Sequence, residues 1–143
     1  MRVVFDCNVI VSALVSPNGP CAELVDLVHS GTLQLMLSEE IVAEYRRVVA
    51  YPRVVQRLAG DVQESQLLVQ KIYDFGHLTE PSTTIQVVDA DPTDNKFIAC
   101  AVSGNAPFII SGEKHLLELG SYQGIQVLRP KEMLFLLGSG SPS

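Results

Sequence analysis

The sequence contains no tryptophan, only three cysteines, and no apolar run that approaches the length of a membrane span. A membrane-spanning helix needs roughly 20 consecutive apolar residues, so we expect none here. Cys7, Cys21 and Cys100 are odd in number and lack the paired spacing of zinc ligands. This indicates reduced thiols in a cytoplasmic protein and argues against a structural zinc site. The N-terminus has no charged region followed by a cleavage site, so we expect no signal peptide.

Basic residues are also few, with 10 Lys and Arg against 16 Asp and Glu and a net charge of −6. This balance argues against a sequence-blind nucleic-acid binder, which would carry a broad basic face. A nuclease is not excluded, because a bound cation cancels the charge of acids that hold it. Four of the basic side chains lie close together, and they form either a solvated helix face or a rim that contacts phosphates or a partner: Arg46, Arg47, Arg53 and Arg57.

The chain of 143 residues, 47% of them apolar, has the size and composition of a single domain with a real core. It shows no internal repeat and no linker between two domains. We therefore expect one domain over residues 1–137. Residues 138–143, which are glycine, serine and proline, are expected to form a flexible tail.

Short apolar runs alternate with segments of helical period along the chain. The expected strands are 3–5, 33–37, 85–88, 108–110 and 125–128, and the expected helices are 20–30, 39–50, 61–75, 93–102, 113–119 and 131–137. Continuously apolar strands separated by helices predict an α/β fold, whose parallel sheet is covered on both faces. Ligands of such sheets bind outside the carboxyl ends of the strands.

Four carboxylates lie where this topology would bring them to one edge of the sheet: Asp6, Glu44, Asp94 and Glu113. Asp6 follows the first strand, Asp94 and Glu113 flank the strand at 108–110, and Glu44 lies on an early helix. Clustered acids repel one another unless a divalent cation neutralises them. The pattern therefore predicts a magnesium or manganese site and suggests phosphodiester hydrolysis.

Each of these acids also has a simpler interpretation. Asp6 could cap the next turn, but a buried acid without a partner is costly, which favours a ligand role. Glu44 could equally be a surface acid beside an apolar stripe. Asp94 belongs to an acidic run that, taken alone, is only an acidic loop, and Glu113 begins a helix, where the dipole favours any acid. Their compatible places in one topology carry more weight than any one of them.

Two neighbouring polar residues could support this site. Asn8 can orient a ligand or water, or hydrogen-bond the backbone, and Ser12 can donate a hydrogen bond to a carboxylate. His115 is expected on the surface, because no second histidine is spaced to share a metal with it.

Four blocks of sequence resemble the motifs of PIN-domain proteins: Phe5-Asp6-Cys7-Asn8-Val9, Glu44 before Tyr45-Arg46-Arg47-Val48, Asp94-Asn95-Lys96-Phe97-Ile98-Ala99-Cys100-Ala101, and Ile109-Ile110-Ser111-Gly112-Glu113-Lys114-His115-Leu116-Leu117. The similarity is greatest to the VapC-like toxin components of prokaryotic toxin–antitoxin systems. It covers the chain to about residue 137, and the blocks occur in the family's order.

The resemblance implies a three-layer α/β/α domain with a five-stranded parallel sheet in the order 3-2-1-4-5. It also implies an endoribonuclease dependent on Mg²⁺ or Mn²⁺. Asp6, Glu44 and Asp94 match the three acids of the family site, and Asn8 matches the polar residue after the first. Glu113 stands where the family usually has aspartate; the longer side chain could shift the ion or favour manganese.

In the implied mechanism, Asp6, Asp94 and Glu113 hold the ion, directly or through water, and Glu44 helps to position it or the attacking water. In-line attack would leave a 5′-phosphate and a 3′-hydroxyl. Substrate phosphates could meet the side chains of Arg46, Arg47 or Lys114. The resemblance further implies an antitoxin partner, and such toxins commonly pair as homodimers.

The main alternative is a catalytically weak PIN fold that binds a protein or RNA, which Glu113 and the acidic net charge support. A haloacid-dehalogenase-type phosphatase would need a general acid where this chain has Asn8. A response-regulator receiver would need paired acids before the end of the first strand, and residues 1–4 contain none.

Overall fold

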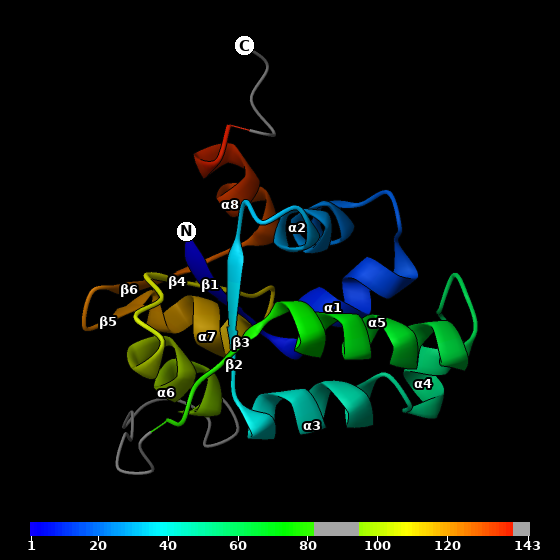
Figure 1. The fold of residues 1–143 in the computed structure, drawn as a ribbon. Coiled ribbons are helices and arrows are strands. Elements are labelled where there is room, and N and C mark those ends of the chain that lie inside the picture. Colours follow the sequence, from blue (N-terminus) through cyan, green and yellow to red (C-terminus); the bar gives the residue numbers. More distant parts are fainter. Residues whose placement is uncertain (82–94, 139–143) are drawn as a thin grey trace.

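The computed structural model describes residues 1–81 and 95–138 (Figure 1). Its strands are β1 (Arg2–Phe5), β2 (Gln34–Leu37), β3 (His77–Leu78), β4 (Phe108–Ile110), β5 (Ser121–Tyr122) and β6 (Ile125–Leu128). They form one six-stranded sheet in the order β3-β2-β1-β4-β6-β5. All neighbours pair in parallel except β5 and β6.

The predicted α/β fold and the predicted strand order are confirmed. The strands expected at 3–5, 33–37, 108–110 and 125–128 correspond to β1, β2, β4 and β6, and they lie in the expected order. The strand next to β2 is β3, seven residues before the expected strand at 85–88, which lies outside the described residues. The antiparallel strand β5 was not expected. A two-residue turn connects it to β6, with Gln123 and Gly124 both at positive φ.

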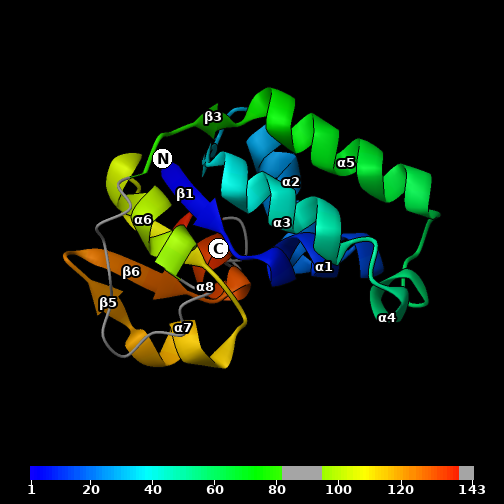
Figure 2. The ribbon, with the colours of Figure 1, turned by 90° about the horizontal axis from the view of Figure 1, so that it is seen from below.

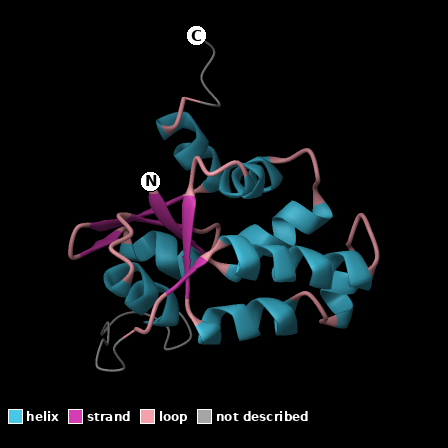
Figure 3. Ribbon diagram, in the orientation of Figure 1, coloured by secondary structure: helices cyan, strands magenta, loops and turns pink. Residues whose placement is uncertain are grey.

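The helices are α1 (Cys7–Val15), α2 (Pro20–His29), α3 (Glu39–Val48), α4 (Pro52–Val55), α5 (Val62–Phe75), α6 (Asn95–Ser103), α7 (Lys114–Leu119) and α8 (Pro130–Leu136). In the view of Figure 2, α6 lies on one side of β1, and α2 and α3 lie on the other. Figure 3 shows the strands gathered in one half of the molecule and a group of helices in the other. Within the described residues, no helix combines the length and hydropathy needed to cross a membrane.

Helix α1 was not predicted, because its sequence is apolar on nearly every side. Val9, Ile10 and Val11 are consecutive, β-branched and buried, a pattern that favours a strand by propensity. The helix forms because Asp6 caps its N-terminus, and because it packs against α2 and β1. This cap fixes the orientation of Asp6 at the end of β1.

Parallel pairing aligns the ends of β1 and β4. Phe5 lies beside Ile110 in the register, and the Asp6 backbone N–H donates to the Ile110 carbonyl at 3.0 Å. Asp6 and Ser111 therefore leave adjacent strands at the same edge. On the other side, the fully buried Tyr45 of α3 donates its hydroxyl to the Phe5 carbonyl. This contact ties α3, which carries Glu44, to the end of β1.

Candidate functional site

Asp6 is a buried carboxylate held by neutral donors. Its side chain is 6% exposed, in a core made mainly of apolar residues. The backbone N–H of Asn8 donates to Oδ1 at 3.3 Å, and the Ser111 hydroxyl donates to Oδ2 at 2.6 Å. Burial raises the pKa of Asp6 above its usual value, although these hydrogen bonds act in the opposite direction. Asp6 thus has unneutralised negative charge when it is ionised.

Ser111 links Asp6 to Glu113. Its hydroxyl oxygen accepts a hydrogen bond from the Glu113 N–H at 2.8 Å while it donates to Asp6. The charge of Glu113 contributes to the raised pKa of Asp6, after the larger effect of burial. The structure therefore brings these two predicted acids together at the carboxyl ends of β1 and β4.

Glu113 is also the N-cap of α7. Its Oε2 atom accepts hydrogen bonds from the N–H groups of His115 at 2.8 Å and Leu116 at 3.2 Å. The simpler interpretation of this residue, a helix cap, is thus correct in the structure. Oε1 takes part in none of the hydrogen bonds among the described residues, so capping leaves one carboxylate oxygen for another ligand.

Glu44 is bonded at both carboxylate oxygens. Lys96 Nζ donates to Oε1 at 2.5 Å, Arg47 reaches the same oxygen at 3.4 Å, and the Cys7 thiol donates to Oε2 at 3.0 Å. Burial opposes ionisation of Glu44, but these hydrogen bonds and the charges of Lys96 and Arg47 lower its pKa below the usual value. Glu44 is therefore an ionised, neutralised carboxylate beside the residue that follows Asp6.

The thiol of Cys7 remains protonated between these two acids. Burial, and then the hydrogen bond and charge of Glu44, raise its pKa well above the usual value. Cys7 thus acts as a hydrogen-bond donor to Glu44. It is buried like Cys21 and Cys100, and all three are free cysteines, as the sequence predicted.

Asp94, the fourth predicted acid, lies outside the described residues, as do Asp89 and Asp91. Helix α6 begins at the next residue, Asn95, and the Lys96 side chain reaches Glu44. The N-terminus of α6 therefore lies beside Glu44.

Asn8 and Ser12 are the residues predicted to support the site. Asn8 is exposed and offers its backbone N–H to Asp6. Ser12, also exposed, makes no hydrogen bond to a carboxylate within residues 1–81 and 95–138. The Ser12 side chain lowers the pKa of the Cys21 thiol on α2, although burial raises that pKa more strongly. The bond between Ser12 and a carboxylate stays a prediction.

The residues predicted to contact RNA have different surroundings. Arg47 is 58% exposed and lies at the rim of the site through its contact with Glu44. Arg46 donates to Gln70 on α5 at 3.2 Å instead. Lys114 is 81% exposed and pairs loosely with Glu118 at 3.8 Å. Lys114 lines a groove of about 560 Å³ next to Glu113, together with Gly112 and Arg129.

Carboxylate oxygens are the ligands that Mg²⁺ and Mn²⁺ prefer. Asp6 and Glu44 differ in how well they fit a cation. Asp6 takes part in no ion pair among the described residues, whereas Glu44 has two basic partners. In the same part of the chain, no three His, Cys, Asp or Glu side chains are grouped closely enough to hold a metal. Asp6 and Glu113 suit a cation in charge and chemistry, and a third protein ligand would have to come from elsewhere.

Analysis of the sequence missed three side chains that build this region: Cys7, Lys96 and Ser111. Each lies beside a predicted acid in the sequence, within a motif already quoted. Their partners are distant, however: Lys96 is 52 residues from Glu44, and Ser111 is 105 residues from Asp6. Proximity to the motifs was the one signal that could have identified them.

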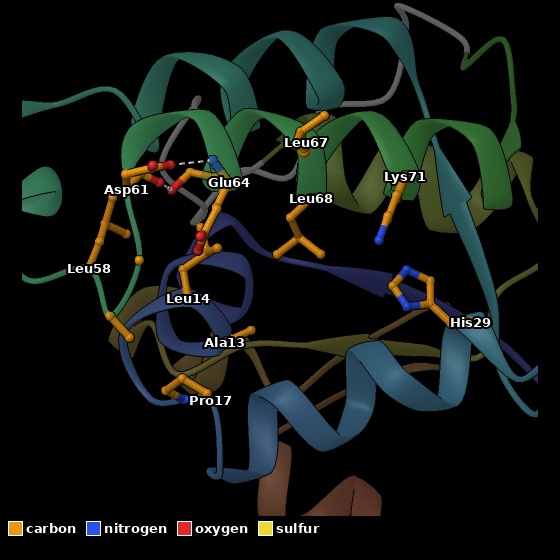
Figure 4. A pocket seen from close by; sticks show the side chains of 13 residues that line it. Ala13, Leu14, Pro17, His29, Leu58, Asp61, Glu64, Leu67, Leu68 and Lys71 are labelled. Carbon is orange, nitrogen blue, oxygen red and sulfur yellow. Dashed lines mark hydrogen bonds between the residues drawn. The ribbon is translucent and has the colours of Figure 1, made fainter.

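A separate pocket of about 480 Å³ lies between α1, α2 and α5 (Figure 4). Leu14 and Leu68 contribute apolar walls, and the His29 and Lys71 side chains approach each other at one end. Asp6, Glu44 and Glu113 are absent from its lining. This pocket is therefore distinct from the carboxylate site.

Comparison with known proteins gives three results. A family model described as "PIN domain" matches residues 2–115. An uncharacterized protein of Methanocaldococcus jannaschii is 30% identical over 119 residues, which cover 83% of this chain and 75% of that protein. A chain in the crystal structure of VapBC2 from Rickettsia felis, bound to a DNA fragment from their promoter, superposes with a TM-score of 0.58. That match covers 90% of this chain and 98% of the other at 10% identity, so it shows similarity of fold alone.

Proposed function

This chain belongs to the PIN-domain family, and from that membership we propose that it is an endoribonuclease dependent on Mg²⁺ or Mn²⁺. The proposed reaction is hydrolysis of RNA phosphodiester bonds. The proposed site comprises Asp6, Glu44, Asp94 and Glu113, with Asn8 in support.

The observation that carries this proposal is the chain of contacts around Asp6. Ser111 joins it to Glu113, and the adjacent Cys7 joins it to Glu44. Asp6 and Glu113 thus follow the parallel strands β1 and β4 at their carboxyl ends, where α/β sheets bind their ligands, and Glu44 of α3 is linked to this edge through Cys7. A buried aspartate that has no basic partner within residues 1–81 and 95–138 favours a cation at this point.

Asp6, Glu113 and Asp94 are the residues that would hold the ion. The chemistry that a bound divalent ion supplies is activation of water and neutralisation of phosphate charge. Ser111 orients Asp6 by its hydrogen bond, and the Asp6 cap of α1 fixes that carboxylate in the fold. Glu44 stays ionised and holds Lys96, while the surrounding core excludes bulk water from one side.

The single-stranded substrate would pass over the exposed rim of this edge. Arg47 lies beside Glu44, and Lys114 and Arg129 line the groove next to Glu113. Lys114 and Arg129 form only loose ion pairs with Glu118 and Glu132, at 3.8 and 4.0 Å, and both pairs are exposed. Such pairs are worth little, so a phosphate can displace them.

We further propose that the protein is the toxin of a toxin–antitoxin pair and acts in the cytoplasm. The fold similarity to a chain of the VapBC2 structure supports a cognate antitoxin as its partner. A homodimer is part of this proposal, as is a single PIN domain over residues 1–137.

Cleavage of RNA tests the assignment. We expect the purified protein to cleave single-stranded RNA with Mn²⁺. Asp6→Asn and Asp94→Asn should lower the rate at least a hundredfold, because each removes a charged ligand. The measurement is the rate of appearance of fragments from an end-labelled RNA.

Glu23→Gln is the matched control, because it removes one exposed acid from α2 without touching Asp6 or the groove next to Glu113. It should cleave at the wild-type rate. Equal rates for the wild type and both aspartate variants would contradict the proposed site and point to a contaminating nuclease.

A second candidate function is a PIN fold that binds RNA or a protein without cleaving it. The observation that favours it is the cap of α7, which uses one oxygen of Glu113. RNA binding with no cleavage and no uptake of Mn²⁺ by the folded protein would support this candidate over the nuclease.

A further inference from the structure

The acids on the two sides of the site differ in whether the protein neutralises their charge. Asp6 and Glu113 are connected through the neutral hydroxyl of Ser111. Glu44 is instead paired with Lys96 at 2.5 Å and with Arg47 at 3.4 Å. A bound cation would therefore balance the charge of ionised Asp6, whereas the charge of Glu44 is already neutralised by the protein.

Glu44 is also poorly placed to take up an ion of its own. Lys96 and Glu44 are only 10% and 17% exposed, so water screens the pair weakly. The second oxygen of Glu44 is occupied by the Cys7 thiol. To bind a metal ion, Glu44 would have to leave an ammonium behind in a largely buried position, which is costly.

The Lys96 ammonium can donate hydrogen bonds beyond the one that it gives to Glu44. Its ammonium has three N–H donors, and Glu44 is its one hydrogen-bond acceptor among the described residues. The remaining donors can meet an oxygen of a phosphodiester. The group lies on the second residue of α6, close to the edge where the acids meet.

We propose that Lys96, held by Glu44, takes the place of a second metal ion, so that this site binds a single divalent cation beside Asp6. This inference rests on the proposed metal-dependent function. In this scheme the Lys96 ammonium supplies the positive charge, and Glu44 positions Lys96 through their ion pair instead of binding a metal ion.

The number of bound ions tests the inference independently of cleavage. Equilibrium dialysis with Mn²⁺ should give one ion per wild-type chain. In Lys96→Met, which removes the charge but keeps an unbranched side chain, Glu44 is released, and we expect two ions per chain. The double variant Glu44→Gln/Lys96→Met should return to one, and Lys96→Arg should stay at one.

Folding of each variant is checked by circular dichroism. If Lys96→Met does not fold, Lys96→Gln replaces it, since glutamine also removes the positive charge paired with Glu44 but keeps a polar side chain. Two ions in the wild type, or one ion in a folded Lys96→Met or Lys96→Gln, would overturn the inference.

The outcomes also separate this inference from the proposed function. If the wild-type protein cleaves RNA and binds two ions, the proposed function stands and the proposed role of Lys96 is wrong. If the folded wild-type protein neither binds Mn²⁺ nor cleaves RNA, both the proposed function and the proposed role of Lys96 are wrong.

Discussion

Asp6 and Glu44 are both carboxylates of the same site, yet their surroundings act on them in opposite directions. Burial raises the pKa of Asp6, which has neutral donors as partners. Burial also opposes ionisation of Glu44, but Lys96, Cys7 and Arg47 outweigh it and lower the pKa of Glu44. Glu44 has charged partners and Asp6 has none among the described residues, so the charge of ionised Asp6 is the one that a bound cation would balance.

Asp6→Asn is expected to stabilise the metal-free protein at neutral pH. With a raised pKa in the fold, Asp6 binds protons more tightly in the folded than in the unfolded state. Stability therefore falls as the pH rises from the usual pKa of 3.8 through the raised value. Thermal unfolding in EDTA at pH 7.5 should show a midpoint higher by a few degrees, since about 1 kcal/mol moves it by roughly 2–4 °C at this chain length.

Asp6→Ala is the control for this measurement. It removes the charge and also the cap of α1, so it should lower the midpoint, as loss of a cap costs about 0.5–2 kcal/mol. The advantage of Asp6→Asn should shrink as the pH is lowered toward 3.8. A similar loss of stability in both variants would show that ionised Asp6 is not a source of strain.

At the scale of the element, helices α1 and α7 carry the site because their N-caps are the predicted acids. Asp6 caps α1 through the Asn8 N–H, and Glu113 caps α7 through His115 and Leu116. A helix N-terminus favours negative charge, so both acids are held where a metal ion would meet them. One side chain thus serves both the local fold and the site.

Glu113→Ala should lower the free energy of unfolding by about 1 kcal/mol, because two N–H groups of α7 lose their acceptor. Glu118→Ala on the same helix loses one exposed ion pair and should cost about 0.2–0.5 kcal/mol. Urea unfolding of the metal-free proteins measures both. Equal losses would mean that the cap contributes nothing to stability.

Glu113→Asp separates the cap from the metal site. Aspartate is a strong N-cap, so stability should stay near the wild type. Its shorter side chain should suit the tight geometry of Mg²⁺, and we expect the ratio of cleavage with Mg²⁺ to cleavage with Mn²⁺ to rise severalfold. An unchanged ratio would mean that Glu113 does not set the preference for the metal.

At the scale of the whole molecule, metal binding should raise the free energy of unfolding. A ligand that binds only the folded state at 100 times its dissociation constant adds about 2.7 kcal/mol. We therefore expect saturating Mn²⁺ to raise the unfolding midpoint of the wild type by several degrees, as measured by calorimetry. Asp6→Asn should show no such rise, whereas Glu118→Gln should match the wild type. An equal rise in Asp6→Asn would contradict a site beside Asp6.

Much of this architecture could be predicted from local patterns. The apolar runs that became β1, β2, β4 and β6 are short and bounded by polar residues, and most predicted helices begin and end within two residues of the observed ones. Helix α1 could not be predicted in this way. Its apolar residues face α2 and β1 at once, so no amphipathic period remains in the sequence.

The sequence by itself determined the strand order expected of the family, the positions of Asp6 and Glu113 after β1 and β4, and the capping role of Glu113. These features depend on short-range patterns and on motifs within one segment. Only the tertiary structure decided the partners of Asp6 and Glu44. The contacts of Ser111 with Asp6 and of Lys96 and Cys7 with Glu44 join residues 105, 52 and 37 positions apart. The charge balance of the site depends on contacts between residues that are far apart in the sequence. Burial and neighbouring charges act through space, so a local sequence pattern does not reveal them.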